Sequence, residues 1–160
     1  MSSPKPKKQD LIARLIAAFR ASGNQDAAFD NRAAERLGIN QTDLHCLNAI
    51  ENAGGLTAGQ LAAAVGVTTG AVTGVVDRLE RAGYARRVPD PEDRRRVMIE
   101  VTPEFYARAG EIWGPLAAEW EQALNERFTA AELDRIVDFL ELSTEIGGRH
   151  LERLGEMQKR

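Results

Sequence analysis

Three consecutive arginines, Arg94–Arg96, follow a turn-forming stretch that holds two prolines. A guanidinium group is always charged and presents a fork of N–H donors, which suits phosphate oxygens and narrow minor grooves. Asp93 stands beside the arginines, and we expect it to pair with one of them and brace the tip. These residue types indicate contacts with a nucleic acid. On an isolated hairpin, a solvated charge cluster would be the simpler interpretation.

A helix is expected over residues 69–82, because apolar side chains recur on one face of it: Val72, Val75, Val76 and Leu79. The opposite side then carries threonines and glycines, whose small size allows a close approach to base edges. Threonine can hydrogen-bond to a base or a phosphate, and its methyl group can touch a thymine methyl. Thr68 or Thr69 is expected to cap this helix, and its first N–H groups suit a phosphate. Capping alone is the alternative explanation.

The elements around these two groups must position them. Thr57 and Gln60 match a capping box that begins a short helix, which ends at Gly66. Residues 85–88 and 97–101 are short, β-branched and alternating, which predicts a hairpin with a long tip. Helix, turn, helix and arginine-tipped hairpin are typical of a winged helix-turn-helix. That module places its second helix in the major groove and its hairpin against the DNA backbone or minor groove.

Further helices are expected on both sides of this module, so the predicted fold class is mostly α with one β-hairpin wing. They cover residues 11–19 and 27–37 with an interruption at Gly23-Asn24, the segment between Asn40 and Gly54, and the segments after Pro103 and Thr129. The predicted division is an N-terminal tail and dimerisation helix over 1–38, the winged helix-turn-helix over 39–102, and C-terminal dimerisation helices over 103–160.

Charge and composition indicate where the protein acts and which kind of partner it binds. The net charge is −3, with +2 over residues 1–102 and −5 over residues 103–160, so the basic charge gathers where the hairpin is. Local field matters more for DNA binding than the total charge. The chain has one cysteine and no run of about 18 apolar residues. Residues 11–19 are interrupted by Arg14, so we expect them to form an amphipathic helix and not a secretory signal. We therefore expect a cytoplasmic protein with no membrane span.

Enzyme interpretations lack the necessary residues. The two histidines, His45 and His150, lie far apart, and the sequence has no HExxH, no CxxC and no phosphate-binding glycine loop. We expect no catalytic activity, no metal site and no cofactor. The serious alternative is a winged helix that serves as a protein-interaction adaptor without specific DNA binding.

The stretch Asp93-Arg94-Arg95-Arg96-Val97-Met98-Ile99-Glu100-Val101-Thr102 resembles the wing signature of the MarR family of bacterial transcription regulators. That signature is Asp-x-Arg, five residues, then Leu-Thr, and Val101 replaces the Leu. The segments Leu56–Ala62 and Val75–Gly83 are also similar to the family. The similarity covers roughly residues 40–105 in motif and nearly the whole chain in helix order.

The resemblance implies a homodimeric repressor or activator, with repression favoured, whose two reading helices meet successive major grooves of near-palindromic double-stranded DNA. By position, Arg95 matches the family's minor-groove arginine and Asp93 its anchoring acid. Gly74 departs from the longer polar side chain of many relatives, so base readout there is expected to be thin. The candidate DNA contacts are Thr68, Thr69, Gly70, Thr73, Gly74, Arg78, Arg94, Arg95 and Arg96.

Two further features of the family are expected here. Terminal helices are expected to form the dimer interface through Leu11, Ile12, Leu15, Ile16, Leu133, Ile136, Leu140, Leu151 and Leu154, with an intramolecular core as the alternative. A small phenolic or aromatic effector could enter a pocket lined by Phe19, Phe29, His45 and Trp113, although aromatics at helical spacing usually pack in a core. Cys46 lies on a pattern that indicates burial, so we interpret it as an inert core residue.

Overall fold

The computed structural model describes residues 6–91 and 93–157. Its elements are α1 (Lys8–Leu37), α2 (Gln41–Ala53), β1 (Leu56–Thr57), α3 (Ala58–Val65), α4 (Thr69–Arg81), β2 (Ala85–Pro89), β3 (Val97–Val101), α5 (Pro103–Arg127) and α6 (Ala130–Met157). The chain forms two compact units, Met1–Ile112 and Trp113–Arg160. Their boundary lies inside α5, whereas the sequence-based division at 38/39 and 102/103 follows expected roles and stays a prediction.

Helices α2 and α3 begin at the caps that local chemistry predicts, and α3 ends at the predicted glycine. Asn40 caps α2 by accepting a hydrogen bond from the Asp43 N–H at 2.9 Å. Thr57 and Gln60 form the expected capping box of α3. Gly66 ends α3 with a φ of 70°, a left-handed conformation that glycine adopts without a Cβ clash. The helix-turn-helix pair, α3 and α4, is therefore confirmed.

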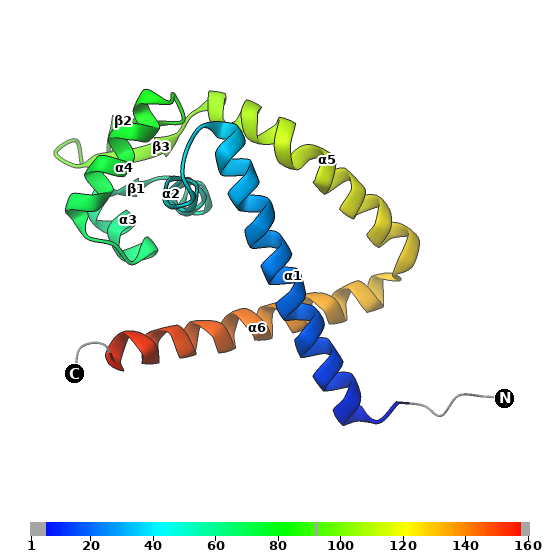
Figure 1. Ribbon diagram of the computed structural model, residues 1–160. Coiled ribbons are helices and arrows are strands. Elements are labelled where there is room, and N and C mark those ends of the chain that lie inside the picture. The colour runs from blue at the N-terminus through cyan, green and yellow to red at the C-terminus, as the bar shows by residue number, and fades with distance from the viewer. Residues whose placement is uncertain (1–5, 92, 158–160) are drawn as a thin grey trace. The chain divides into compact units, whose positions relative to one another are not determined.

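A three-stranded antiparallel sheet in the order β1-β3-β2 packs beside these helices (Figure 1). The predicted hairpin is confirmed, with Ala85 opposite Val101 and Pro89 opposite Val97. Strand β1 is absent from the sequence prediction, because two residues carry no alternating pattern. Leu56 and Thr57 form a strand because they pair with Ile99 and Met98 of β3 in the tertiary structure.

The core of the first unit joins α2, α3, α4 and the sheet. Its largest fully buried side chains include Leu44, Leu47, Ile50, Leu61, Val72, Val76, Leu79, Ile99 and Phe105. Tyr84 closes one side, where its hydroxyl donates to the Leu37 carbonyl at 3.1 Å and its ring lies 5.8 Å from that of Phe105. Burial of the apolar stripe of α4 therefore determines which side of that helix faces outward.

Helix α1 differs from the sequence prediction. It runs without interruption from Lys8 to Leu37, so the predicted break at Gly23-Asn24 is wrong. A single glycine inside a helix costs only about 1 kcal/mol relative to alanine, and the surrounding alanines and charged residues favour helix. Its buried residues, Ala33, Ala34 and Leu37, all belong to its last turns.

The second unit holds the end of α5 and all of α6. No residue of α6 is buried over its whole described length, although its apolar side chains recur at helical spacing. Among the described residues, no single helix is long and apolar enough to cross a membrane; α3 and α4 reach that length only together, with a bend of 105° between them.

Candidate DNA-binding interface

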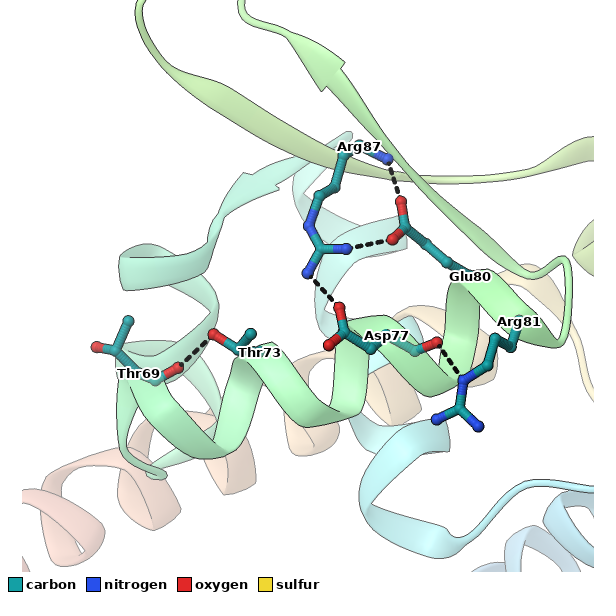
Figure 2. Close-up of polar contacts among 6 residues, drawn as sticks. All are labelled: Thr69, Thr73, Asp77, Glu80, Arg81 and Arg87. Carbon is teal, nitrogen blue, oxygen red and sulfur yellow. Dashed lines mark hydrogen bonds and ion pairs between the residues drawn. The ribbon is translucent and has the colours of Figure 1, made fainter.

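Helix α4 begins at a threonine cap. The Thr68 hydroxyl oxygen accepts a hydrogen bond from the Ala71 N–H at 3.3 Å, so Thr68 rather than Thr69 is the N-cap. Thr69, Gly70 and Thr73 are exposed on the side opposite the buried valines, and Gly74 is half-buried. The Thr73 hydroxyl donates to the Thr69 carbonyl at 3.3 Å (Figure 2). Its oxygen therefore keeps acceptor capacity for an outside donor.

Two acidic residues share this helix and contact a single arginine. Arg87, in β2, approaches α4 from the sheet and binds the carboxylates of Asp77 and Glu80 (Figure 2). Arg81 donates to the Asp77 carbonyl at 3.1 Å. The carboxylates and their hydrogen bonds hold the pKa of Arg87 above its ordinary value, with the Asp77 hydrogen bond as the largest cause. Sequence reasoning missed this cluster, although strand alternation requires Arg86 or Arg87 to face the helices.

The structure gives Arg78 an intramolecular partner that the sequence prediction did not include. Its Nε and Nη2 donate to the two carboxylate oxygens of Asp43 in α2, at 3.1 and 2.6 Å. The Asp43 side chain is buried, and its hydrogen bond raises the pKa of Arg78. The guanidinium that the prediction placed among the DNA contacts thus anchors α4 to α2, because a buried carboxylate needs a charged partner.

The wing tip is braced mainly through the backbone. The Asp93 carboxylate accepts a hydrogen bond from the Arg95 N–H at 3.0 Å, and its carbonyl accepts from the Arg96 N–H at 2.8 Å. The ion pair with an arginine of the tip is made by Asp90, whose carboxylate lies 3.5 Å from Arg96 Nε. The structure therefore differs from the expected Asp93–arginine pair, because a carboxylate in a tight turn reaches nearby N–H groups first.

Arg94 and Arg95 have exposed side chains at this tip. Within residues 6–91 and 93–157, neither side chain takes part in an ion pair. The sequence-predicted contacts therefore fall into three groups. These are the threonine and glycine face of α4, the exposed Arg94 and Arg95 of the wing, and two arginines with intramolecular carboxylate partners, Arg78 and Arg96.

Two of the residues predicted for the effector pocket line different cavities of the first unit. His45 lines a cavity of about 240 Å³ between α1 and α2, together with Asp30, Gln41, Thr42, Leu44 and Asn48. Phe29 lines another of about 300 Å³, with Arg32, Arg36 and Glu111 among its neighbours. Phe19 is 45% exposed on α1, and Trp113 belongs to the second unit. Helical periodicity cannot tell which cavity a side chain enters, so the four could not be separated from sequence.

Cys46 is completely buried in α2. Burial, followed by the nearby Asp43 charge, raises the pKa of its thiol. Among the described residues, no group of three or more His, Cys, Asp or Glu side chains is arranged to hold a metal ion.

Comparison with known proteins gives the same architecture. The sequence profile of the MarR family matches residues 39–97. The HTH-type transcriptional regulator YcgE of Bacillus subtilis is 36% identical over 152 residues, which cover 95% of this chain and 98% of that protein. The multiple antibiotic resistance protein MarR of Salmonella typhimurium is 31% identical over 122 residues, which cover 76% of this chain and 83% of that protein.

A solved structure shares this fold. Mutant MarR from E. coli, crystallised with operator DNA, aligns with a TM-score of 0.52 at 23% identity, covering 86% of this chain and 99% of that one. The winged helix, the matched sequence profile and the two relatives that align over most of the chain agree. Together they show that this chain belongs to the MarR family of transcriptional regulators.

Proposed function

We propose that this chain is a non-catalytic, sequence-specific DNA-binding repressor that acts in the cytoplasm as a homodimer on a near-palindromic operator. One observation carries the proposal: the exposed threonine and glycine face of α4 occurs in the same compact unit as a wing that presents Arg94 and Arg95. Small side chains let a helix enter the major groove, and unpaired guanidinium groups suit phosphates and the minor groove. The operator complex of the E. coli protein supports this use of the fold.

Within this proposal, the predicted DNA contacts take different roles. Thr69, Gly70 and Thr73 face bases, and Thr68 caps the helix whose first N–H groups meet a phosphate. Arg95 enters the minor groove and Arg94 contacts the backbone. Gly74 adds little readout because it has no side chain.

A second copy of the chain is the proposed partner of the terminal helices. A helix of 13 residues reads few base pairs, so two-fold symmetry supplies the remaining contacts. Leu11, Ile12, Leu15 and Ile16 of α1 are each 46–53% exposed, and Leu140, Leu151 and Leu154 of α6 are 48–72% exposed. An exposed apolar face on each of these helices is typical of an interface, and a homodimer is the commonest way to cover such faces.

We also propose that a small aromatic effector releases the protein from DNA. The cavity beside His45 supports it, because Thr42 and Leu44 line that cavity and flank Asp43, which holds Arg78 of α4. A ligand that prefers a shifted first turn of α2 would bias the position of the reading helix.

The test is selection of bound duplexes from a random pool with the purified 160-residue chain, followed by titration of the enriched duplex at several salt concentrations. We expect an enriched inverted repeat and an affinity that falls steeply with salt. Arg95→Ala is expected to weaken binding by about 1–3 kcal/mol while the protein stays folded. A protein-interaction adaptor would instead enrich no sequence, and Arg95→Ala would leave its duplex affinity unchanged.

A further inference from the structure

The exposed side of α4 carries an electrostatic cost for DNA binding. Asp77 and Glu80 project from this helix with side chains 52% and 33% exposed, on the part that follows the threonine face. Two uncompensated carboxylates near a groove would repel phosphates. Arg87 of β2, outside the helix, binds both carboxylates and offsets part of this repulsion.

Arg87 makes three contacts with these two acids. Its Nη2 donates to Asp77 Oδ1 at 2.8 Å, its Nη1 donates to Glu80 Oε2, and its backbone N–H donates to Glu80 Oε1 at 3.0 Å. Figure 2 shows the Arg87 side chain descending from the strand between the two carboxylates. An isolated exposed pair contributes little, but a network that uses both terminal nitrogens of the guanidinium and a backbone donor fixes geometry as well.

The sheet explains why this residue reaches the helix. Arg87 lies opposite Ile99, which is buried, so both belong to the sheet face that meets the helices. Arg86 lies opposite Glu100 on the other face and pairs with it across the hairpin at 2.9 Å. Because β2 is an edge strand, the Arg87 N–H can be used by Glu80. The two neighbouring arginines thus connect different elements.

We propose that Arg87 is a positioning residue for DNA recognition: through Asp77 and Glu80 it holds the wing at a defined place relative to α4, so that both engage one duplex in register. This inference rests on the proposed DNA-binding function and deepens it. The guanidinium also neutralises one of the two acidic charges that α4 would otherwise present to DNA. Arg86 has the same charge and lies on the same strand, so it is the matched control.

The first measurement needs no DNA. A nitroxide at Ala71→Cys, an exposed position on α4 in a Cys46→Ala background, reports its distance to the backbone amides of residues 93–97 through paramagnetic relaxation. Arg87→Gln is expected to change the relaxation of these wing amides, whereas Arg86→Gln leaves it as in the parent. An Arg87→Gln pattern identical to that of the parent overturns the proposal.

The second measurement compares the affinities for the selected duplex and for a random duplex. Arg87→Gln is expected to lower their ratio about tenfold, since coupled contacts of this kind carry such energies. Asp77→Asn with Glu80→Gln is expected to lower the ratio similarly while raising the random-duplex affinity. The variant that combines all three substitutions should have an affinity ratio no lower than that of Arg87→Gln alone. Arg87→Lys should not restore the parent ratio, because an ammonium group lacks the forked donors of a guanidinium.

A direct phosphate contact by Arg87 gives a different result and contradicts the proposal. Arg87→Gln would then weaken both duplexes equally and reduce the salt slope by about 1, and removing the two acids would leave the ratio unchanged. Failure of the proposed function is separate: the parent chain would enrich no duplex, while the relaxation measurement would still report whether Arg87 places the wing.

Discussion

At the level of single residues, the arginines of the first unit divide by what they contact. Arg78 and Arg87 bind carboxylates of the same chain, whereas Arg94 and Arg95 extend from the wing without an ion pair among the described residues. Residue type and spacing alone do not separate these groups, since all four are exposed arginines near the reading helix. The difference is decided by which carboxylates the fold brings within reach.

The Arg78–Asp43 pair leads to a prediction about stability. Arg78→Ala leaves the Asp43 carboxylate, with 2% of its side chain exposed, without its charged partner. We expect the free energy of unfolding to fall by about 3 kcal/mol, measured by urea denaturation at fixed protein concentration. Arg81→Ala is the control, because Arg81 is exposed and its guanidinium donates to a backbone carbonyl rather than to a buried carboxylate. Equal losses for the two variants would contradict the anchoring role.

Cys46 leads to a prediction about pH. Its raised pKa means that the reactive thiolate forms only above the ordinary range of a cysteine, so the native thiol stays protonated at neutral pH. We expect no alkylation by iodoacetamide at pH 7.5 and rapid alkylation once urea unfolds the chain. Mass spectrometry measures both. Fast modification of the native protein would instead indicate an accessible, redox-active thiol.

At the level of elements, the orientation of α4 follows from its two opposite faces, one apolar and one carrying threonines and glycines. Val72, Val76 and Leu79 are buried against α2 and the sheet, so the threonine face has only one direction to point. The caps and the apolar stripe make this helix predictable from sequence. The continuity of α1 through Gly23 was not predictable in the same way, because a helix-breaking residue is outweighed by its neighbours.

Gly70 separates an effect on folding from an effect on DNA binding. A Cβ built at Gly70 meets nothing within 4 Å, so Gly70→Ala is expected to leave stability unchanged or to raise it by up to about 1 kcal/mol. The same methyl group would stand between α4 and the groove, so operator affinity should fall. Thermal unfolding and fluorescence anisotropy measure the two quantities.

Gly59→Ala, in α3, is the matched control for this experiment, because its Cβ also meets open space. It should change stability in the same direction and by a similar amount, and it should leave operator affinity close to that of the parent. If Gly70→Ala bound the operator as tightly as Gly59→Ala does, the start of α4 would not contact DNA.

At the level of the whole molecule, the apolar side chains of α6 require a cover. Leu151 and Leu154 are 72% and 59% exposed in the single chain. We expect Leu151→Glu with Leu154→Glu to convert a dimer to the 17.6 kDa single chain, because charges on a buried interface are not solvated. Multi-angle light scattering measures the mass, and circular dichroism checks that the helices persist.

Arg153→Glu serves as the control for the dimer experiment. Arg153 lies between Leu151 and Leu154 in the sequence and is exposed, so the variant adds negative charge to the same segment without replacing an apolar side chain. It should leave the mass unchanged. A double leucine variant that retained the parent mass would show that the interface lies elsewhere, and the terminal helices would then need another partner.

The sequence by itself determined the order of the helices after α1, the caps at Asn40 and Thr57, the hairpin and the wing signature, because each depends on interactions between residues close together in the chain. It also predicted the family, which the relatives confirm. The tertiary structure alone decided the third strand β1, the separation of His45 and Phe29 into two cavities, and the partners of Arg78 and Arg87. Those partners are 35, 10 and 7 positions away in the chain, in other elements, and no local pattern encodes such distances. Periodicity gives the face on which a side chain lies, whereas the packing of elements decides which charge it meets there.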